Sequence, residues 1–151
     1  MARFRYSMQS ILDIKLKMEN QAKQDFSSAR AALDEEEEKL GVLWERKREY
    51  ERRGARLLSG TLNFRDIEDN KTAILCMDSF IAEQQVHVKE AERRLEQARM
   101  KLTEAMMERK THENLKEKAF DEFLREENRQ EGKEVDELTS YTYGQKRSVQ
   151  A

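Results

Sequence analysis

The sequence contains no proline in its 151 residues, and it has only five glycines and one cysteine. Because proline is the residue that most strongly ends a helix, its absence leaves few positions at which a helix must stop. The single cysteine, Cys76, cannot form an internal disulfide, and we interpret it as a small residue beside a helix seam in a reducing compartment. Long helices interrupted at glycine are therefore expected.

Long apolar runs are also missing, so no segment is predicted to span a membrane. The first five residues include two arginines, but the hydrophobic stretch of a secretory signal does not follow them. Charged residues make up 40% of the chain, and the mean hydropathy is −1.01. The 29 basic residues nearly balance the 31 acidic ones, which argues against general nucleic-acid binding. The composition suits a two-helix seam better than a deep globular core.

A heptad pattern fills much of the second half of the chain. From Ile67 to Ala105, apolar positions recur at alternating steps of three and four, the spacing by which one long helix packs against another. The clearest seam positions are Ile74, Met77, Ile81, Val88, Ala91, Leu95, Ala98, Leu102 and Ala105. Only Gln84 interrupts this series with a polar residue. The pattern argues against disorder and predicts a helix over about 64–140.

A second apolar stripe runs through the first half at steps of three, four and seven. Its members are Phe4, Met8, Ile11, Met18, Ala22, Phe26, Ala29, Leu33, Leu40, Leu43 and Tyr50. Lys15 and either Glu36 or Glu37 fall where the stripe would place an apolar residue. Such polar gaps help to fix the register of paired helices. The stripe predicts a helix over about 3–54.

The turn between the two helices is predicted at about 54–63, where Gly54 and Gly60 punctuate the pattern. Asn63 is a suitable helix cap, because Asp66 follows it in the first turn, where a carboxylate complements the helix dipole. The predicted fold is all-α, a long antiparallel two-helix coiled-coil hairpin. It is expected to form a single domain over 1–140, with a frayed tail over 141–151.

The two predicted arms differ in length. At about 1.5 Å per residue, the second helix is roughly 110 Å long and the first is roughly 80 Å. The longer arm should therefore lack a partner from roughly Leu115 onward. This overhang still carries apolar residues, namely Leu115, Ala119, Phe120, Phe123, Leu124, Val135 and Leu138. An exposed apolar stripe of this kind indicates an external partner.

The sequence offers no constellation for catalysis. His87 and His112 lie roughly 37 Å apart along one helix, so they cannot share a metal ion. Glycine-rich phosphate loops are absent, and the acidic run 34–38 points around the helix axis. We therefore expect no enzymatic activity, no cofactor and no metal site. A basic cluster over 46–56 has two open interpretations, a solvated face and a docking site for an acidic partner.

Several segments, taken in order, resemble the flagellar FliJ family of type III export proteins. They are the opening element 4–13, Tyr50, the Phe80-Ile81-Ala82 triplet, the segments 105–110 and 115–118, and the ending 133–138. The last element is the most specific, because Lys133-Glu134-Val135-Asp136-Glu137-Leu138 matches the family's ending. The resemblance covers nearly the full chain through the order and spacing of these segments.

The resemblance implies a non-enzymatic coiled coil similar to the central stalk of rotary ATPases. Its implied partners are the hexameric flagellar export ATPase, the membrane export-gate protein and export chaperones, without nucleic acid and without direct membrane insertion. The implied location is the cytoplasm, peripherally associated with the membrane at the flagellar base. Two alternatives stay open, the equivalent stalk of a virulence injectisome and a generic scaffolding coiled coil that forms an extended parallel dimer.

The resemblance also implies two sets of candidate contact residues. The ATPase-ring candidates lie at the two chain ends and are Phe4, Met8, Ile11, Phe123, Val135, Asp136 and Leu138. The export-gate candidates are Phe80, Ile81 and Gln84. Gln84 replaces an apolar residue sometimes seen in the family. Without the resemblance, Phe80 beside the seam has two interpretations, an edge cap and a partner anchor.

Overall fold

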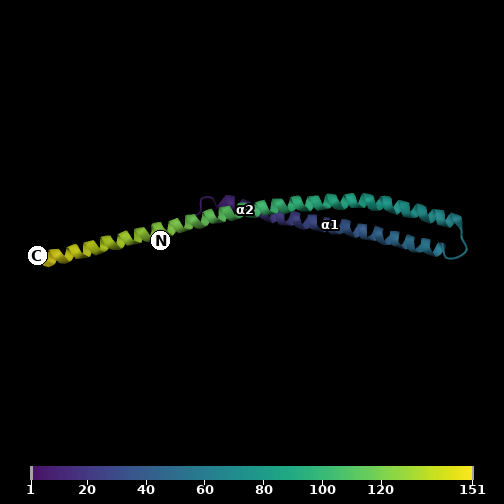
Figure 1. Ribbon diagram of the computed structural model, residues 1–151. Coiled ribbons are helices and arrows are strands. Elements are labelled where there is room, and N and C mark those ends of the chain that lie inside the picture. The colour runs from purple at the N-terminus through teal and green to yellow at the C-terminus, as the bar shows by residue number, and fades with distance from the viewer. Residues whose placement is uncertain (1, 151) are drawn as a thin grey trace. The chain divides into compact units, whose positions relative to one another are not determined.

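A computed structural model describes residues 2–150 of the chain, with side chains described as far as residue 147. The described residues form two helices, α1 (Gln9–Leu57) and α2 (Phe64–Gln150), joined by a short turn. The helices pack against each other as a hairpin, and through residues 20–104 they lie side by side (Figure 1). The predicted all-α coiled-coil hairpin is confirmed.

The helix bounds differ from the expected ones at three points. α1 begins at Gln9 instead of residue 3, since residues 2–6 have no regular structure and residues 7–8 form a turn. It continues to Leu57, because Gly54 adopts a helical conformation and does not end it. α2 runs to Gln150, so the expected frayed tail is helical as far as that residue, and residue 151 lies outside the described residues. With no proline to stop α2, a glycine costs the helix only about 1 kcal/mol.

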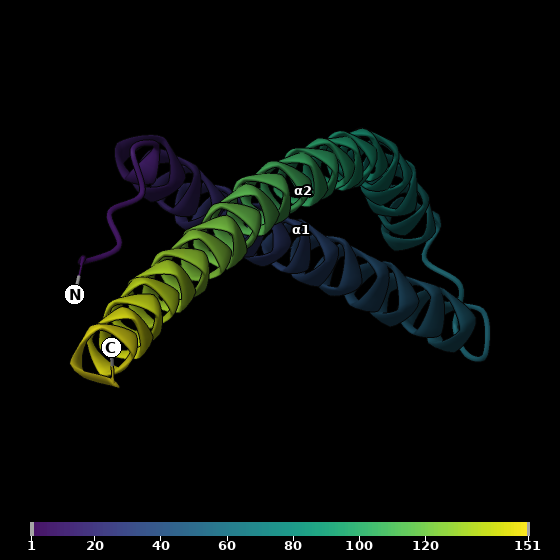
Figure 2. The same ribbon diagram turned by 90° about the vertical axis from the view of Figure 1, so that its left-hand side faces the viewer.

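The turn covers residues 58–63 and connects the end of α1 to the start of α2 (Figure 2). The main-chain nitrogen of Leu58 donates to the Gly54 oxygen at 3.3 Å, which closes the last turn of α1. The Asn63 side-chain oxygen accepts hydrogen bonds from the main-chain nitrogens of Arg65 at 3.1 Å and Asp66 at 3.4 Å. Asn63 is therefore the predicted cap, satisfying two main-chain donors that the helix itself leaves free.

The chain divides into two compact units. The turn unit comprises Asn20 to Glu104, and the end unit comprises the residues up to Glu19 together with those from Ala105 onward. In the turn unit, Leu33 packs with Val88 and Ala91, and all three are buried. Leu40 and Leu95 pack against this cluster. The predicted heptad positions of both helices thus form the seam within the turn unit.

The end unit pairs the start of the chain with part of α2. Leu12 is 4% exposed, and the Phe4 ring lies 5.2 Å from Phe120 and 5.4 Å from Phe123, between ring centroids. Beyond residue 127, every side chain as far as residue 147 is exposed. The overhang therefore starts near residue 128 and not near Leu115, because the irregular N-terminal segment extends the cover beyond the start of α1.

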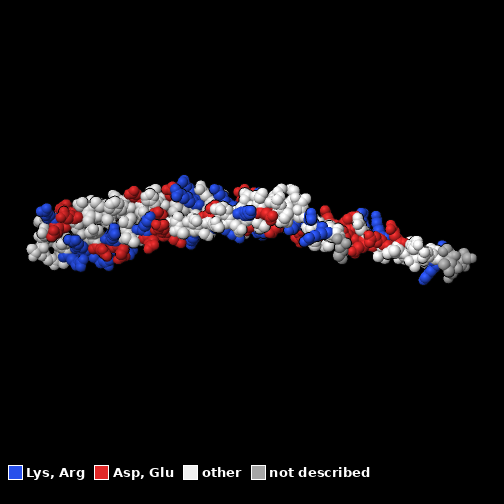
Figure 3. Space-filling model, turned by 180° about the vertical axis from the view of Figure 1, so that it is seen from behind, with Lys and Arg blue, Asp and Glu red and all other residues white. Residues whose placement is uncertain are grey.

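Charges of both signs are interspersed along the helices, and the face drawn in Figure 3 shows blue and red atoms intermingled. Many of these charges form ion pairs within one helix at spacings of three or four residues, such as Arg94 with Glu90 at 2.9 Å. Exposed pairs of this kind contribute little to stability, typically below about 1 kcal/mol. In the described part of the chain, neither helix contains a stretch long and apolar enough to cross a membrane.

Candidate partner-binding surfaces

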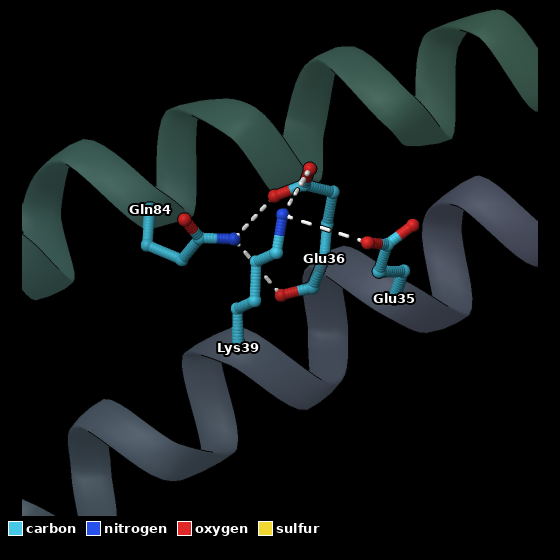
Figure 4. Close-up of polar contacts among 4 residues, drawn as sticks. All are labelled: Glu35, Glu36, Lys39 and Gln84. Carbon is cyan, nitrogen blue, oxygen red and sulfur yellow. Dashed lines mark hydrogen bonds and ion pairs between the residues drawn. The ribbon is translucent and has the colours of Figure 1, made fainter.

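Polar side chains occupy several seam positions of the turn unit, and Gln84 is the clearest of them. Only 9% of Gln84 is exposed. Its side-chain Nε2 donates to the main-chain oxygen of Glu36 at 3.0 Å and to the Glu36 carboxylate at 2.5 Å (Figure 4). Because a buried amide is costly unless its hydrogen bonds are made, this pairing favours one register of the two helices.

Glu36 is the acidic side chain that fills the polar gap predicted at Glu36 or Glu37, since Glu37 is exposed. Its carboxylate also lies 3.5 Å from the Lys39 amine, which in turn lies 3.8 Å from Glu35 (Figure 4). The hydrogen bond from Gln84 lowers the pKa of Glu36 below its ordinary value, and the charge of Lys39 acts in the same direction. The charged form of Glu36 is therefore the form that the seam accommodates.

A second polar seam contact is made by Asn70, which the sequence pattern did not identify as a seam residue. Asn70 is 7% exposed, and its Nδ2 donates to the main-chain oxygen of Tyr50 at 3.0 Å. A Cβ atom built on Gly54 would lie 2.8 Å from the same nitrogen. Gly54 is therefore a seam residue that admits Asn70, and not the turn residue that we expected. The signal was present, because Asn70 falls three residues after Ile67 in the heptad series.

The three export-gate candidates are neighbours on α2, but they differ in exposure. Ile81 is 4% exposed and Gln84 is 9% exposed, so both contribute mainly to the seam. Phe80 is 50% exposed and presents a large part of its ring to solvent. Any direct contact at this site therefore falls on Phe80, with Ile81 and Gln84 holding its helix in place. The assignment of this site to the export gate stays a prediction.

Charged residues occupy part of the seam of the end unit. Glu19, whose side chain is 5% exposed, forms an ion pair with Arg109, whose side chain is 18% exposed. Lys15 pairs with Glu108 at 2.9 Å. The stripe in the sequence placed Met18 at the seam, but Met18 is 48% exposed and Glu19 takes its place. Because the apolar Met18 already filled this step of the stripe, Glu19 could be found only through its partner on α2.

The ATPase-ring candidates at the start of the chain lie in and beside this paired region. Phe4 and Phe123 come together with Phe120 in an aromatic cluster. Ile11 is half-buried, and Met8 is 43% exposed beside the first turn of α1. These residues therefore serve mainly to cover the last paired part of α2, and they leave little apolar surface for a partner.

The remaining ring candidates lie on the overhang of α2. Val135 is 59% exposed, Leu138 is 65% exposed, and Asp136 between them is also exposed. They lie roughly 18 Å or more beyond Phe123 along the helix, at its rise of about 1.5 Å per residue. The structure thus separates the candidates into a paired group and a free group. Val135 and Leu138 of the free group line a shallow patch, together with Thr139, Thr142, Tyr143 and Lys146.

The side chains exposed on these surfaces are mainly apolar and aromatic. Across the side chains that the structure describes, no three His, Cys, Asp or Glu residues converge as a metal ion would require. Cys76 is exposed and does not line the seam as we expected, because Ile74 and Met77 take the seam positions. Exposed apolar and aromatic side chains on helix faces are typical of sites for protein partners.

Comparison with known proteins identifies the family. The family model for the flagellar FliJ protein matches residues 4–148. The chain belongs to the FliJ family. This match confirms the family inferred by resemblance, a family associated with type III export. The match includes both helices and both sets of candidate contact residues.

One solved structure shares this fold with the FliJ-family chain. It is described as a candidate YscO homologue from Chlamydia trachomatis, with 24% sequence identity and a TM-score of 0.69. The alignment covers 97% of this chain and 99% of that one. At this identity the likeness supports the hairpin fold alone. No curated protein matches the chain.

Proposed function

We propose that this chain is a non-enzymatic component of the flagellar type III protein export apparatus. In this proposal it binds the hexameric export ATPase and promotes its assembly, contacts the membrane export gate, and escorts export chaperones. Family membership supports the general role. The observation that carries the specific role is the unpaired end of α2, where Val135 and Leu138 are exposed on a part of the helix that no other described residues cover.

The unpaired end has the chemistry that a protein ring would bind. Burying an exposed Val or Leu side chain at an interface is favourable by about 1.5–3 kcal/mol. Tyr143 adds an aromatic side chain that is 66% exposed in the same patch. A helix with apolar side chains on its surface suits insertion between partner helices. The paired aromatic cluster around Phe4 would then support the base of the inserted helix.

The decisive experiment replaces the free apolar residues with charges. We expect Val135→Asp/Leu138→Asp to abolish stimulation of the export ATPase, because two carboxylates would have to be desolvated in the ring. The measurement is the ATP hydrolysis rate of the purified ATPase with increasing amounts of each variant. Circular dichroism should show unchanged helicity, since both side chains are already in solvent.

A matched control uses two residues of similar exposure elsewhere on α2. Leu75 is 66% exposed and Met107 is 65% exposed, so Leu75→Asp/Met107→Asp introduces the same charge on similar surface. This variant should stimulate the ATPase as the unmodified chain does. Full stimulation by the Val135→Asp/Leu138→Asp variant would refute the role of the free end.

The export-gate contact is tested separately at Phe80. Phe80→Ala should leave helicity intact and weaken capture of the cytoplasmic part of the gate protein at least about tenfold, the effect of losing one aromatic anchor. Leu75→Ala, which also truncates an exposed apolar residue of α2, is the control. Unchanged capture and motility with Phe80→Ala would remove this site from the proposal.

The hairpin also supports the stalk role over the scaffolding alternative. A parallel dimer would need the α1 and α2 seams to face a second copy, whereas here the seams of one chain face each other. The hairpin does not discriminate against the injectisome alternative, because an injectisome stalk protein would use the same fold. Neighbouring genes would separate the two export systems.

A further inference from the structure

The turn between the helices has an unusual composition. In the fourteen residues from Arg52 to Arg65, every charged residue is an arginine, while the whole chain has a formal net charge of −2. We call this segment the turn cap. Its charged residues are Arg52, Arg53, Arg56 and Arg65. Elsewhere on the helices positive and negative side chains are interspersed, whereas the turn cap carries only positive ones.

Three of the four arginines of the turn cap have no ion-pair partner among the described side chains. All four are exposed. Arg52 lies 3.3 Å from the Glu45 carboxylate, outside the cap. No carboxylate among the described side chains lies within ion-pairing distance of Arg53, Arg56 or Arg65. By contrast, the nearby Lys47 is bound to Asp78 at 2.7 Å, which raises the pKa of the Lys47 amine. Most of the positive charge of the cap is therefore uncompensated.

Large apolar side chains project from the same segment. Leu58 is 65% exposed, Leu62 is 52% exposed and Phe64 is 76% exposed. Phe64 has the highest exposed fraction of the large hydrophobic residues described. The Asn63 cap fixes the start of α2, so Phe64 is held at a defined place next to the turn. Three apolar groups thus stand in solvent within seven residues, flanked by arginine on both helices.

A shallow hollow beside the turn adds a place for anionic groups. All of its lining residues belong to α1. They are the four arginines Arg46, Arg52, Arg53 and Arg56, one carboxylate, Glu49, and Tyr50 and Ala55, so basic side chains outnumber acidic ones by four to one. Guanidinium groups bind phosphate through paired hydrogen bonds, which makes arginine the preferred side chain for phosphate recognition. The hollow and the projecting apolar residues therefore offer two complementary kinds of contact within one small region.

We propose that the turn cap docks on an anionic phospholipid surface, with its arginines on the lipid phosphates and Leu58, Leu62 and Phe64 in the head-group region. Arginine and apolar side chains together are the composition by which proteins bind membrane interfaces without crossing them. This contact is superficial, so it differs from the helix insertion that the sequence argues against. It does not depend on the proposed roles of Phe80 or of the free end.

A membrane surface fits the cap better than an acidic peptide does. The arginines belong to both helices, three on α1 and one on α2, and the apolar residues lie between them along the chain. A peptide lying along one helix would meet only part of this set. An anionic surface approached by the turn can meet charges from both helices, while the apolar residues enter the interface.

The test is flotation of the full chain with lipid vesicles. We expect the chain to float with vesicles made of equal parts phosphatidylcholine and phosphatidylglycerol and to stay behind with phosphatidylcholine alone. Added salt should weaken binding, because it screens charges at the surface. Replacing all four cap arginines with glutamine should reduce affinity at least about tenfold, since each basic side chain near such a surface contributes to binding.

The control variant changes the same net charge elsewhere. It replaces four arginines outside the cap with glutamine, namely Arg30, Arg93, Arg94 and Arg125. This control should float as the unmodified chain does. Replacing the four cap arginines with lysine should also preserve most of the binding, because a lipid surface attracts either cation. Circular dichroism checks that each variant is folded.

A fluorescent residue reports whether the apolar part of the cap enters the interface. In a Trp44→Phe background, Phe64→Trp becomes the sole tryptophan, and its emission should shift to the blue only with the anionic vesicles. Absence of flotation, or equal loss by the cap and control variants, would overturn the proposal. So would capture of an acidic protein by a cap that does not float, because the site would then be a protein interface.

Discussion

The turn unit and the end unit use the same helices in different ways. In the turn unit, apolar residues such as Leu33 and Val88 fill the seam, and amides such as Gln84 fix its register. In the end unit, ion pairs such as Glu19 with Arg109 replace much of the apolar seam. α2 then continues alone, with every described side chain beyond residue 127 exposed.

This difference separates stability from binding. A side chain that is buried by the opposite helix stabilises the hairpin and is hidden from partners. A side chain beyond the paired region adds little to stability, and its apolar surface is available for an interface. In a hairpin of two helices there is no third layer to cover such residues. Surfaces for partners are therefore expected where the pairing stops, at the overhang and at the turn.

The largest expected effect contrasts one leucine from each unit. Leu33→Ala should lower the free energy of unfolding by about 3 kcal/mol, because Leu33 is 7% exposed and packs in the buried cluster with Val88 and Ala91. Leu138→Ala should change it by less than about 0.5 kcal/mol, because Leu138 is 65% exposed. Urea denaturation followed by circular dichroism measures both values. Equal losses would mean that the overhang is covered in solution.

The buried ion pair of the end unit gives the next largest effect. Glu19→Leu should cost about 2 kcal/mol, because it leaves Arg109 partly buried with Glu113 as its remaining ion-pair partner. The double variant Glu19→Leu/Arg109→Leu should recover most of that loss, since two apolar residues suit a seam position. The same denaturation experiment tests this prediction. A double variant no more stable than the single one would show that the pair itself holds the end unit together.

Two helical glycines of the turn unit should respond to alanine in opposite directions. Gly41→Ala should raise the free energy of unfolding by about 1 kcal/mol through helix propensity, because the new Cβ would have no described heavy atom within 4 Å apart from its chain neighbours and the local helix backbone. Gly54→Ala should lower it by about 1 kcal/mol net, because its Cβ displaces the buried Asn70 amide from the Tyr50 oxygen at a cost of about 2 kcal/mol, which exceeds the same gain in helix propensity. Thermal unfolding distinguishes the two outcomes. A stabilised Gly54→Ala variant would refute the close approach of the helices there.

The smallest expected effect is a dependence of stability on pH, caused by the Glu36 carboxylate that accepts a hydrogen bond from Gln84. Because the folded chain lowers the pKa of Glu36 below its ordinary value of 4.5, its contribution is complete above that pH. The contribution is lost as the pH falls through the lowered folded value. Glu36→Gln should therefore reduce the loss of Tm between neutral pH and about pH 3. In a Gln84→Ala background, Glu36→Gln should have much less effect, since the main cause of the shift has been removed.

Much of the hairpin could be predicted because its pattern is local. Heptads from Ile67 to Ala105 predicted the α2 seam, and Asn63 followed by Asp66 predicted the start of that helix. Both depend on neighbours within a few residues along the chain. The choice between Met18 and Glu19 as the seam residue cannot be made from neighbouring residues, because steps of three and four allow either one. Only Arg109, on the opposite helix, decides it.

The candidate surfaces were likewise only partly predictable from local sequence patterns. The sequence identified Phe80 and the apolar residues at the chain ends through resemblance to a family. The heptad pattern already placed Phe80 beside the seam and Ile81 within it, but it could not separate the paired Phe123 from the free Leu138. Composition likewise revealed the arginines near the turn, whereas their freedom from ion pairs depends on where each neighbouring carboxylate lies.

By itself, the sequence determined that this chain forms two long helices that meet along an apolar seam, since helix periodicity and the lack of proline act locally. It also determined the family through the order of its motifs. Only the tertiary structure decided the register, the place where pairing ends and the residues left in solvent. These depend on contacts such as Gln84 with Glu36 and Phe4 with Phe120, between residues far apart in the chain. Local periodicity carries no information about which turn of one helix meets which turn of the other.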